Sequence, residues 1–178
     1  MIVLRDMTEA DIEDYVRWFT VDTDWMRTDA PWEPCGSTPE AERSGWTEYY
    51  ESVKDLPEDV VRWKFEIEWD GKHIGWVSRY SDLEYMDNPG AIPAVGIDIP
   101  ESGWRRQGAG TRALELFIRY LQSKGYRRVY TQTWSGNTAM LRVAEKLGFT
   151  PVCRMPDYRI VDGKAYDAIT LLLEVTEK

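Results

Sequence analysis

The segment WRRQGAGT, residues 104–111, does more than any other part of the chain to define the fold. It lies between a strand expected to end near Ile99 and a helix whose apolar residues recur every three or four positions from Ala113 to Leu121. Small residues let the main chain approach a ligand closely, and the free N–H groups and dipole of a helix start favour an anion. The segment therefore predicts a pyrophosphate site made by Arg105, Arg106, Gln107, Gly108, Ala109, Gly110 and Thr111. The alternative is a glycine-rich turn that carries solvated arginines.

The glycine spacing differs from that of the common nucleotide-binding motifs. A P-loop requires a glycine, four residues, and then Gly-Lys followed by Ser or Thr, and the chain contains no such run. A dinucleotide fingerprint would tolerate Ala113 at its last position, but that motif follows the first strand of a parallel sheet. Here several expected strands precede the glycines, which disfavours a dinucleotide site.

Toward the N-terminus, the residues predict antiparallel strands and two helices. Residues 61–69 alternate apolar and charged side chains, which indicates a half-buried strand, and the turn Asp70-Gly71 leads into another strand over 72–80. A strand over 2–5 precedes a helix capped by Thr8, and Thr38 before Pro39 caps a second helix that continues to Val53. The only histidine, His73, follows the hairpin turn and is expected at the surface.

Toward the C-terminus, the pattern changes to strand, helix, strand. A strand over 94–99 precedes the glycine segment, a strand over 127–133 follows its helix, and residues 137–147 form a further helix closed by Gly148. Two last strands flank the Asp162-Gly163 turn. We expect one α/β (α+β) domain over residues 1–178, with a mixed, mostly antiparallel sheet of about seven strands flanked by about four helices.

Composition excludes several classes of protein. The chain of 178 residues has a net charge of −9, which disfavours nucleic acid as a partner and suits a cationic one. No apolar run approaches the ~20 residues of a spanning helix, and acidic residues come too early for a signal peptide, so no membrane contact and a cytoplasmic location are expected. Cys35 and Cys153 lie far apart without a metal-ligand spacing, so no metal is expected.

Three motifs in order carry a resemblance to a known family. Arg105, Gly108 and Gly110 match the pattern R/Q-x-x-G-x-G/A, and residues 137–149 end in Glu-Lys-Leu-Gly-Phe. Residues 163–167, Gly-Lys-Ala-Tyr-Asp, are similar to a final hairpin. Together they resemble the GNAT superfamily of N-acetyltransferases, in the branch of the ribosomal-protein N-terminal alanine acetyltransferases. The resemblance covers residues 94–175 well and the first half by element order only.

The resemblance implies a fold with a gap in the sheet and acetyl-CoA as co-substrate. The fourth and fifth strands would splay apart and admit the pantetheine arm as an extra strand beside Ile97, Asp98 and Ile99. A backbone N–H there, assigned to Ile97, would polarise the thioester carbonyl. Asn137 would hydrogen-bond the arm; its alternative role is a helix N-cap.

The acceptor is expected to be an amine, which must lose a proton before it attacks. An alkyl ammonium has a pKa of about 10.4, so a base is useful at neutral pH. Asp98 is the leading candidate base, with Asp82 and Glu84 as weaker ones; the alternative for Asp98 is a solvated carboxylate on the other face of the strand. Family members build the acceptor site in the segment that corresponds to residues 22–33. Its carboxylates and indoles suit a cation, and the candidate contacts are Asp24, Trp25, Trp32 and Glu33.

Two positions depart from the family pattern and keep alternatives open. Ala144 and Met140 stand where members carry a tyrosine or a serine that protonates the leaving thiolate, so water, Tyr158 or Tyr166 would have to do so. The leading hypothesis is acetyl transfer to a small cationic molecule or a protein N-terminus by direct attack in a ternary complex. An aminoglycoside-type acetyltransferase and a CoA-binding regulatory module without turnover are the alternatives. The oligomeric state stays open, with a homodimer as one option.

Overall fold

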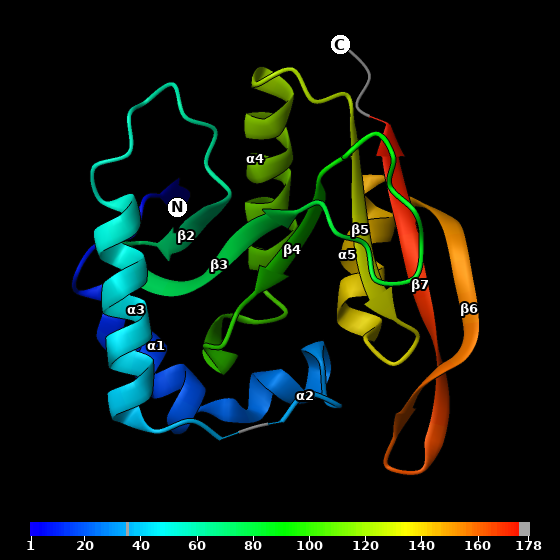
Figure 1. The fold of residues 1–178 in the computed structure, drawn as a ribbon, viewed down its shortest axis with the longest axis horizontal. Coiled ribbons are helices and arrows are strands. Elements are labelled where there is room, and N and C mark those ends of the chain that lie inside the picture. The colour runs from blue at the N-terminus through cyan, green and yellow to red at the C-terminus, as the bar shows by residue number, and fades with distance from the viewer. Residues whose placement is uncertain (35, 175–178) are drawn as a thin grey trace.

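The computed structural model describes residues 1–34 and 36–174, which form a seven-stranded mixed sheet in the order β1-β2-β3-β4-β5-β7-β6. The strands are β1 (Ile2–Arg5), β2 (Lys64–Trp69), β3 (Lys72–Tyr80), β4 (Ala94–Asp98), β5 (Arg128–Trp134), β6 (Thr150–Val161) and β7 (Lys164–Glu174). The helices are α1 (Asp11–Thr20), α2 (Met26–Asp29), α3 (Pro39–Val53), α4 (Ala109–Ser123) and α5 (Thr138–Leu147). All neighbours pair antiparallel except β4 and β5, which are parallel (Figure 1). The predicted fold class is confirmed, with the short α2 as a fifth helix.

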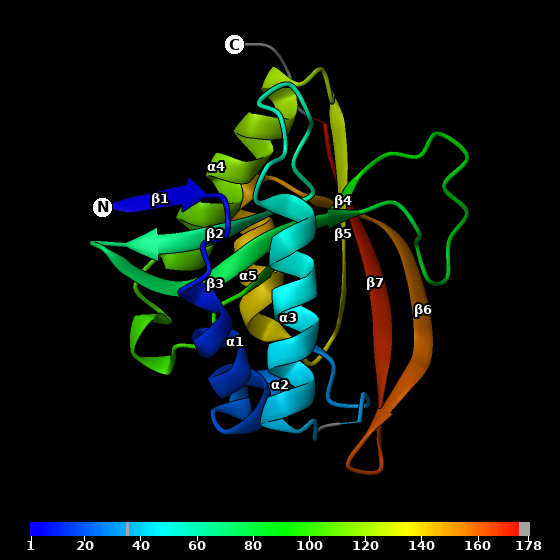
Figure 2. The ribbon, with the colours of Figure 1, turned by 60° about the vertical axis from the view of Figure 1, so that its left-hand side comes forward.

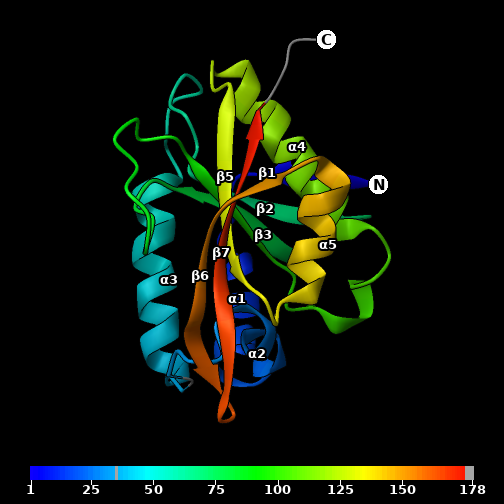
Figure 3. The same ribbon diagram turned by 90° about the vertical axis from the view of Figure 1, so that its right-hand side faces the viewer.

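The helices form two layers, one on each face of the sheet. Viewed from the side, α1 and α3 lie on one face, and α4 and α5 on the other (Figure 3). The main core lies under α4, whose predicted apolar residues are buried as expected: Ala113, Leu114, Phe117, Ile118 and Leu121. A second, aromatic core lies under α1 and is built from Tyr15, Trp18, Trp25 and Trp76.

Both predicted Asp-Gly hairpins are present. Asp70 and Gly71 have φ values of 48° and 82°, and Asp162 and Gly163 have values of 49° and 75°. Two successive positive φ angles are typical of the type I′ turn, whose twist matches that of the flanking strands. Thr38 also caps α3 as predicted, because its side chain accepts a hydrogen bond from the Ala41 N–H at 3.2 Å.

Two predicted boundaries in the first half are wrong: the start of the first helix and the start of the strand over 61–69. The first helix starts at Asp11 rather than after Thr8, because the Asp11 carboxylate accepts bonds from the Thr8 N–H and hydroxyl and closes a separate turn. The strand predicted over 61–69 starts only at Lys64. Its charged residues Lys64 and Glu66 are buried rather than solvated, because α1 and α3 cover the face on which they lie. The strand alternates as predicted, but its polar face is covered by helices and does not meet water.

Candidate active site

β4 and β5 separate soon after they meet. Their register includes one pair, Ala94 with Tyr130, and the Thr131 hydroxyl then donates a 2.8 Å hydrogen bond to the Val95 carbonyl. Beyond this point the two strands diverge (Figure 1). A cavity of about 320 Å³ opens there, lined by Gly96 and Ile97 on β4 and by residues 131–134 on β5. Its wall continues onto Asn137 and Met140 of α5 and onto Asp29 and Ala30, at the end of α2, so it joins the two faces of the sheet.

Two residues that line this cavity, Tyr85 and Thr133, carry a buried hydroxyl without a hydrogen-bond partner among the described residues. The Thr133 hydroxyl is inaccessible to water and makes no hydrogen bond with the described residues. Buried polar groups are almost always hydrogen-bonded, so an unpaired one on a cavity wall indicates a ligand contact. An arm that carries amide groups, such as pantetheine, supplies both donors and acceptors, and the residues present therefore suit it.

The turn before α4 presents its main chain. Arg106 and Gly108 both have positive φ angles, 62° and 86°, and among the described residues no side chain caps α4. A Cβ at Gly108 would meet nothing within 4 Å, so the backbone conformation, not crowding within the protein, favours glycine. The first N–H groups of an uncapped helix have no helical acceptor and form a ready anion site. This arrangement matches the predicted cradle of Gly108, Ala109, Gly110 and Thr111.

The side chains of this turn have other partners than the sequence suggests. The Arg105 guanidinium donates to the carbonyls of Ile99 and Pro100, each at 2.7 Å, and braces the chain where it leaves β4. Gln107 Nε2 donates to the Gly103 carbonyl at 2.6 Å. Arg106 is exposed at the surface. The predicted anion site would thus consist mainly of backbone, with the exposed Arg106 as its cation.

Asn137 is the N-cap of α5, which was its alternative role. Its Oδ1 accepts a hydrogen bond from the Met140 N–H at 3.0 Å, while the residue also lines the cavity. The cap uses the acceptor oxygen, so the Nδ2 donors are the atoms available to a ligand. Met140 lines the same cavity, and Ala144 is fully buried in the main core, so neither position offers an acid.

Ile97 and Asp98 point to opposite faces of β4. Ile97 packs against the α4 side, where it approaches Gly110, and Asp98 lies on the other face beside its cross-strand partner Trp76. Asp98 is half-buried, so it is not the solvated carboxylate that the alternative required. Burial, and next the nearby carboxylate of Asp29, raise the pKa of Asp98 well above its ordinary value, against a smaller opposing effect of Lys64.

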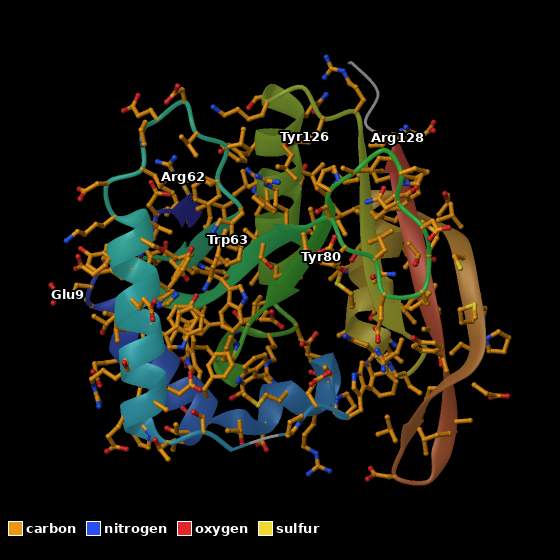
Figure 4. The ribbon with its side chains drawn as sticks, viewed as in Figure 1. Glu9, Arg62, Trp63, Tyr80, Tyr126 and Arg128 are labelled. Atoms are coloured by element: carbon orange, nitrogen blue, oxygen red, sulfur yellow. The ribbon has the colours of Figure 1, made fainter. Side chains whose placement is uncertain are left out.

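The cavity ends in an acidic and aromatic pocket. Asp29, Trp32, Asp82, Glu84 and Arg159 line it, together with Tyr80, the last residue of β3, which lies beside β4 (Figure 4). Arg159 of β6 binds the Glu84 carboxylate, and its guanidinium lies 4.0 Å from the centre of the Trp32 ring. These contacts fix the loop between β3 and β4 against the C-terminal hairpin. Figure 2 shows that loop projecting from the body of the sheet.

The structure divides the predicted acceptor segment. Trp32 lines the cavity, whereas Trp25 is buried in the aromatic core, where its Nε1 donates to the Trp18 carbonyl at 3.0 Å. Trp25 and Glu33 line a second pocket of about 260 Å³. Asp24 lines neither of these two pockets; it lies close enough to Arg105 to act on that group's pKa. Trp25 is therefore primarily a core residue.

His73 was predicted at the surface and is buried. Its ring nitrogens contact Asp14 at 3.1 Å and Glu66 at 3.0 Å, and Asp11 lies 3.2 Å away. Burial alone would lower the pKa of His73, but the hydrogen bonds and charges of these carboxylates outweigh it and raise the pKa to about 9. No local pattern indicated this, because Asp11 and Asp14 come from α1, far away in the sequence, and Glu66 comes from the neighbouring strand β2.

A splayed mixed sheet beside an uncapped, glycine-rich helix start defines the class of CoA-dependent acyltransferase folds. The model of the acetyltransferase (GNAT) domain family matches residues 2–150, and the chain belongs to this family.

Among known proteins, the chain is similar to mycothiol acetyltransferase of Catenulispora acidiphila, with 30% identity over 108 residues. That match covers 56% of this chain and 33% of the relative, so the chain spans about a third of that protein's length. The fold is also that of the ribosomal-protein-S5-alanine acetyltransferase of Vibrio fischeri, with a TM-score of 0.73 and 22% identity over 98% of this chain and 93% of that one. A ribosomal L7/L12 α-N-protein acetyltransferase in complex with coenzyme A has a TM-score of 0.73 and 16% identity, over 98% and 94% of the two chains.

The described helices include none that combines the length and the apolar character needed to cross a membrane.

Proposed function

We propose that this protein transfers the acetyl group of acetyl-CoA to a primary amine by direct attack in a ternary complex. The observation that carries the proposal is the cavity between β4 and β5, which lies beside the open start of α4 and leads to a pocket lined by carboxylates. Family membership supports acetyl-CoA as the donor, and the acidic pocket supports an amine as the acceptor.

The chain offers a separate group for each part of the donor. The backbone of the turn at 106–111 suits the pyrophosphate, Thr133 and Asn137 suit the amides of the arm, and the open edge of β4 around Ile97 suits the thioester carbonyl. A backbone N–H directed at that oxygen stabilises the negative charge that develops during attack. The thioester supplies the electrophilic acetyl carbon.

Asp98, next to the cavity-lining Ile97 on β4 and close enough to the cavity-lining Asp29 to feel its charge, is the proposed acceptor of the amine's proton. An ammonium with a pKa of about 10.4 is neutral in roughly one molecule per thousand at neutral pH, a deficit of about 4 kcal/mol. Because burial raises the pKa of Asp98 well above its ordinary value, its carboxylate form is a stronger base than that of an ordinary aspartate. Asp29, whose own pKa is raised by burial, lies near enough to share in this task.

The pocket favours a cationic acceptor. Arg159, the cation in its lining, is already neutralised by Glu84, so Asp29 and Asp82 leave the pocket negative. Both a small cationic molecule and a protein N-terminus carry the ammonium that this charge attracts. The names of the structural relatives include two ribosomal-protein acetyltransferases, which places N-terminal peptides in the test panel.

The test is release of free thiol from acetyl-CoA in the presence of small diamines, aminoglycosides and peptides with free N-termini. We expect release that depends on one class of amine and rises with pH, and an Asp98→Asn variant should lose the rise. The regulatory module is the competing function, because Met140 and Ala144 supply no acid for the thiolate. Coenzyme binding without release for every amine would favour that module and contradict the transferase.

A further inference from the structure

A lysine is buried in the aromatic core, where a charge is costly. The Lys64 side chain is 3% exposed, and its ammonium nitrogen lies 4.1 Å from the ring centre of Tyr15, 4.2 Å from that of Trp46, 5.0 Å from that of Trp76 and 5.2 Å from that of Tyr49. We call these four rings the aromatic cage. Ring faces attract a cation, and a cage of this kind keeps an ammonium charged away from water. The sequence pattern had placed Lys64 in solvent.

The sheet brings the caged ammonium to the row of Asp98. Glu66 on β2 pairs with Trp76 on β3, and Trp76 pairs with Asp98 on β4, so these three residues form one row across the same face. Lys64 lies two residues before Glu66 and shares that face. Its ammonium lies 5.0 Å from the centre of the Trp76 ring. Trp76 is on β3, between β2 with Glu66 and β4 with Asp98, and neighbouring strands of a sheet lie about 4.8 Å apart.

The Glu66 carboxylate has hydrogen-bond partners other than Lys64. Its Oε2 accepts a 2.5 Å hydrogen bond from the Tyr15 hydroxyl and contacts His73 Nε2 at 3.0 Å, while Lys64 stays 3.8 Å from Oε1. His73 and Tyr15 thus supply the hydrogen bonds of Oε2, and Lys64 acts on Glu66 through its charge alone. The same charge also acts on a second carboxylate on this face, Asp98.

Asp98 is the carboxylate that needs this charge. The ionisable groups that act on it are Asp29 from the end of α2, which opposes its ionisation, and Lys64, which favours it. Those that act on Lys64 are Glu66, Asp98 and Asp11, while the caging hydroxyl groups of Tyr15 and Tyr49 stay neutral because burial raises their pKa. Burial lowers the pKa of Lys64 to about 8, so it remains a cation at neutral pH.

We propose that Lys64 is a positioning residue of the acetyl-transfer site, whose caged ammonium favours the ionised form of Asp98 so that Asp98 can accept a proton from the amine. The catalytic role of Lys64 rests on the proposed function. The electrostatic coupling between Lys64 and Asp98 exists in the free protein and can be measured without an acceptor.

The first experiment is a carbon NMR titration of the Asp98 carboxyl group in the free protein, assigned with Asp98→Asn. Lys64→Met keeps an unbranched side chain in the cage but removes the charge, and it should raise the pKa of Asp98 by at least about one unit. Lys72→Met is the matched control, because Lys72 is 53% exposed at the hairpin and pairs with Glu101. This control should leave the titration of Asp98 unchanged.

The second experiment uses kcat/KM against pH once an acceptor is known. In Lys64→Met the rising limb should move to higher pH by the same amount, with the rate recovered at the plateau, and Lys64→Arg should restore the limb. A merely structural lysine would lower the rate equally at every pH. That result, or an unchanged Asp98 titration in folded Lys64→Met, overturns the proposal.

A reciprocal measurement tests the same coupling if the Lys64→Met variant does not fold. In Asp98→Asn, the nitrogen NMR titration of Lys64 should show a pKa below its original value of about 8, because one stabilising negative charge is gone. An unchanged Lys64 titration contradicts the coupling. If the wild-type protein transfers no acetyl group, the proposed function fails, while both titrations still decide whether Lys64 controls Asp98.

Discussion

At the scale of single residues, buried charges distinguish this molecule from an ordinary α/β protein. Arg5, Asp11, Asp14, His73 and Glu66 form a connected set of ion pairs between β1, α1 and the β2–β3 hairpin. Glu66 and His73 are almost wholly buried, and a charged group in such a place is stable only when it is paired and hydrogen-bonded. Protonation of the histidine therefore contributes to folding itself.

The pH dependence of stability follows from His73. Its pKa is about 9 in the folded protein and about 6.5 when unfolded, so its stabilising effect is complete below pH 6.5 and is lost as the pH rises through 9. We expect the free energy of unfolding to fall by about 1 kcal/mol between pH 6.5 and 7.5, a window that ends below the Lys64 pKa of about 8. Urea denaturation at several pH values measures this, and His73→Gln should remove the slope. Parallel curves for the two proteins would contradict the assignment.

Sequence reasoning found the residues of the cavity better than those of the charged network. Ile97 and Asn137 line the cavity and the glycines and Asp98 lie beside it; motifs and strand patterns, which are local signals, indicate them. Trp32, which also lines the cavity, lies in the segment that the family resemblance assigns to the acceptor. His73, Lys64 and Glu66 are charged residues on a strand beside a hairpin, which is also the pattern of a solvated face. Only the packing of α1 and α3 onto that face distinguishes the two situations, and this packing is not written in any short segment.

At the scale of elements, β5 carries two threonines with opposite roles toward the cavity. Thr131 closes the sheet by its bond to the Val95 carbonyl, whereas the Thr133 hydroxyl has no partner among the described residues. Valine has nearly the same shape as threonine without the hydroxyl, so the same substitution at each site separates the two roles.

Thr131→Val should lower the free energy of unfolding by about 1–3 kcal/mol, because it leaves the buried Val95 carbonyl without its donor. Thr133→Val should leave stability unchanged or raise it slightly, but weaken coenzyme A binding about three- to tenfold. Urea denaturation and titration calorimetry give the two quantities. Equal effects of the two substitutions on both quantities would show that Thr133 is not a ligand contact.

The helices and strands were predictable where a local chemical signal marks their ends. Asp-Gly turns, Thr38 before Pro39, and Gly148 after α5 each fix a boundary by backbone geometry or capping. α2 escaped prediction because its four residues lie in a stretch interrupted by prolines and glycine and lack an apolar period. It is held instead from outside: Trp134 Nε1 on β5 donates to the carbonyls of Thr28 and Asp29 at 3.1 and 2.9 Å.

At the scale of the whole molecule, the sheet consists of two halves that meet at a narrow joint. A few contacts connect the half made of β1–β4 to the half made of β5–β7. They are the Ala94–Tyr130 strand pair, the Thr131 hydrogen bond to Val95, the Arg159–Glu84 ion pair and the Trp134 hydrogen bonds to α2. The α4 helix covers one half and contacts α5 of the other. A ligand in the gap would supply the hydrogen bonds that the sheet lacks there.

Coenzyme A should therefore tighten the joint more than any other region. We expect slower amide hydrogen exchange at residues 96–98 and 131–134 when the coenzyme is present, since a ligand that binds only the folded state protects the groups it orders. β1 and β2, which contribute no residue to the lining of the cavity, serve as the internal control. Equal protection across the whole sheet would indicate global stabilisation without insertion between the strands.

The passage between β4 and β5 also bears on the kinetics of turnover. Its α5 side receives the donor and its α2 side the acceptor in the proposed reaction, so each product can depart by the route through which its parent substrate arrived. Release of one product does not block release of the other, and the cavity imposes no obligatory order of substrate binding. Steady-state inhibition should then be competitive for free coenzyme against donor, and for acetylated amine against acceptor, as in a random bi-bi scheme.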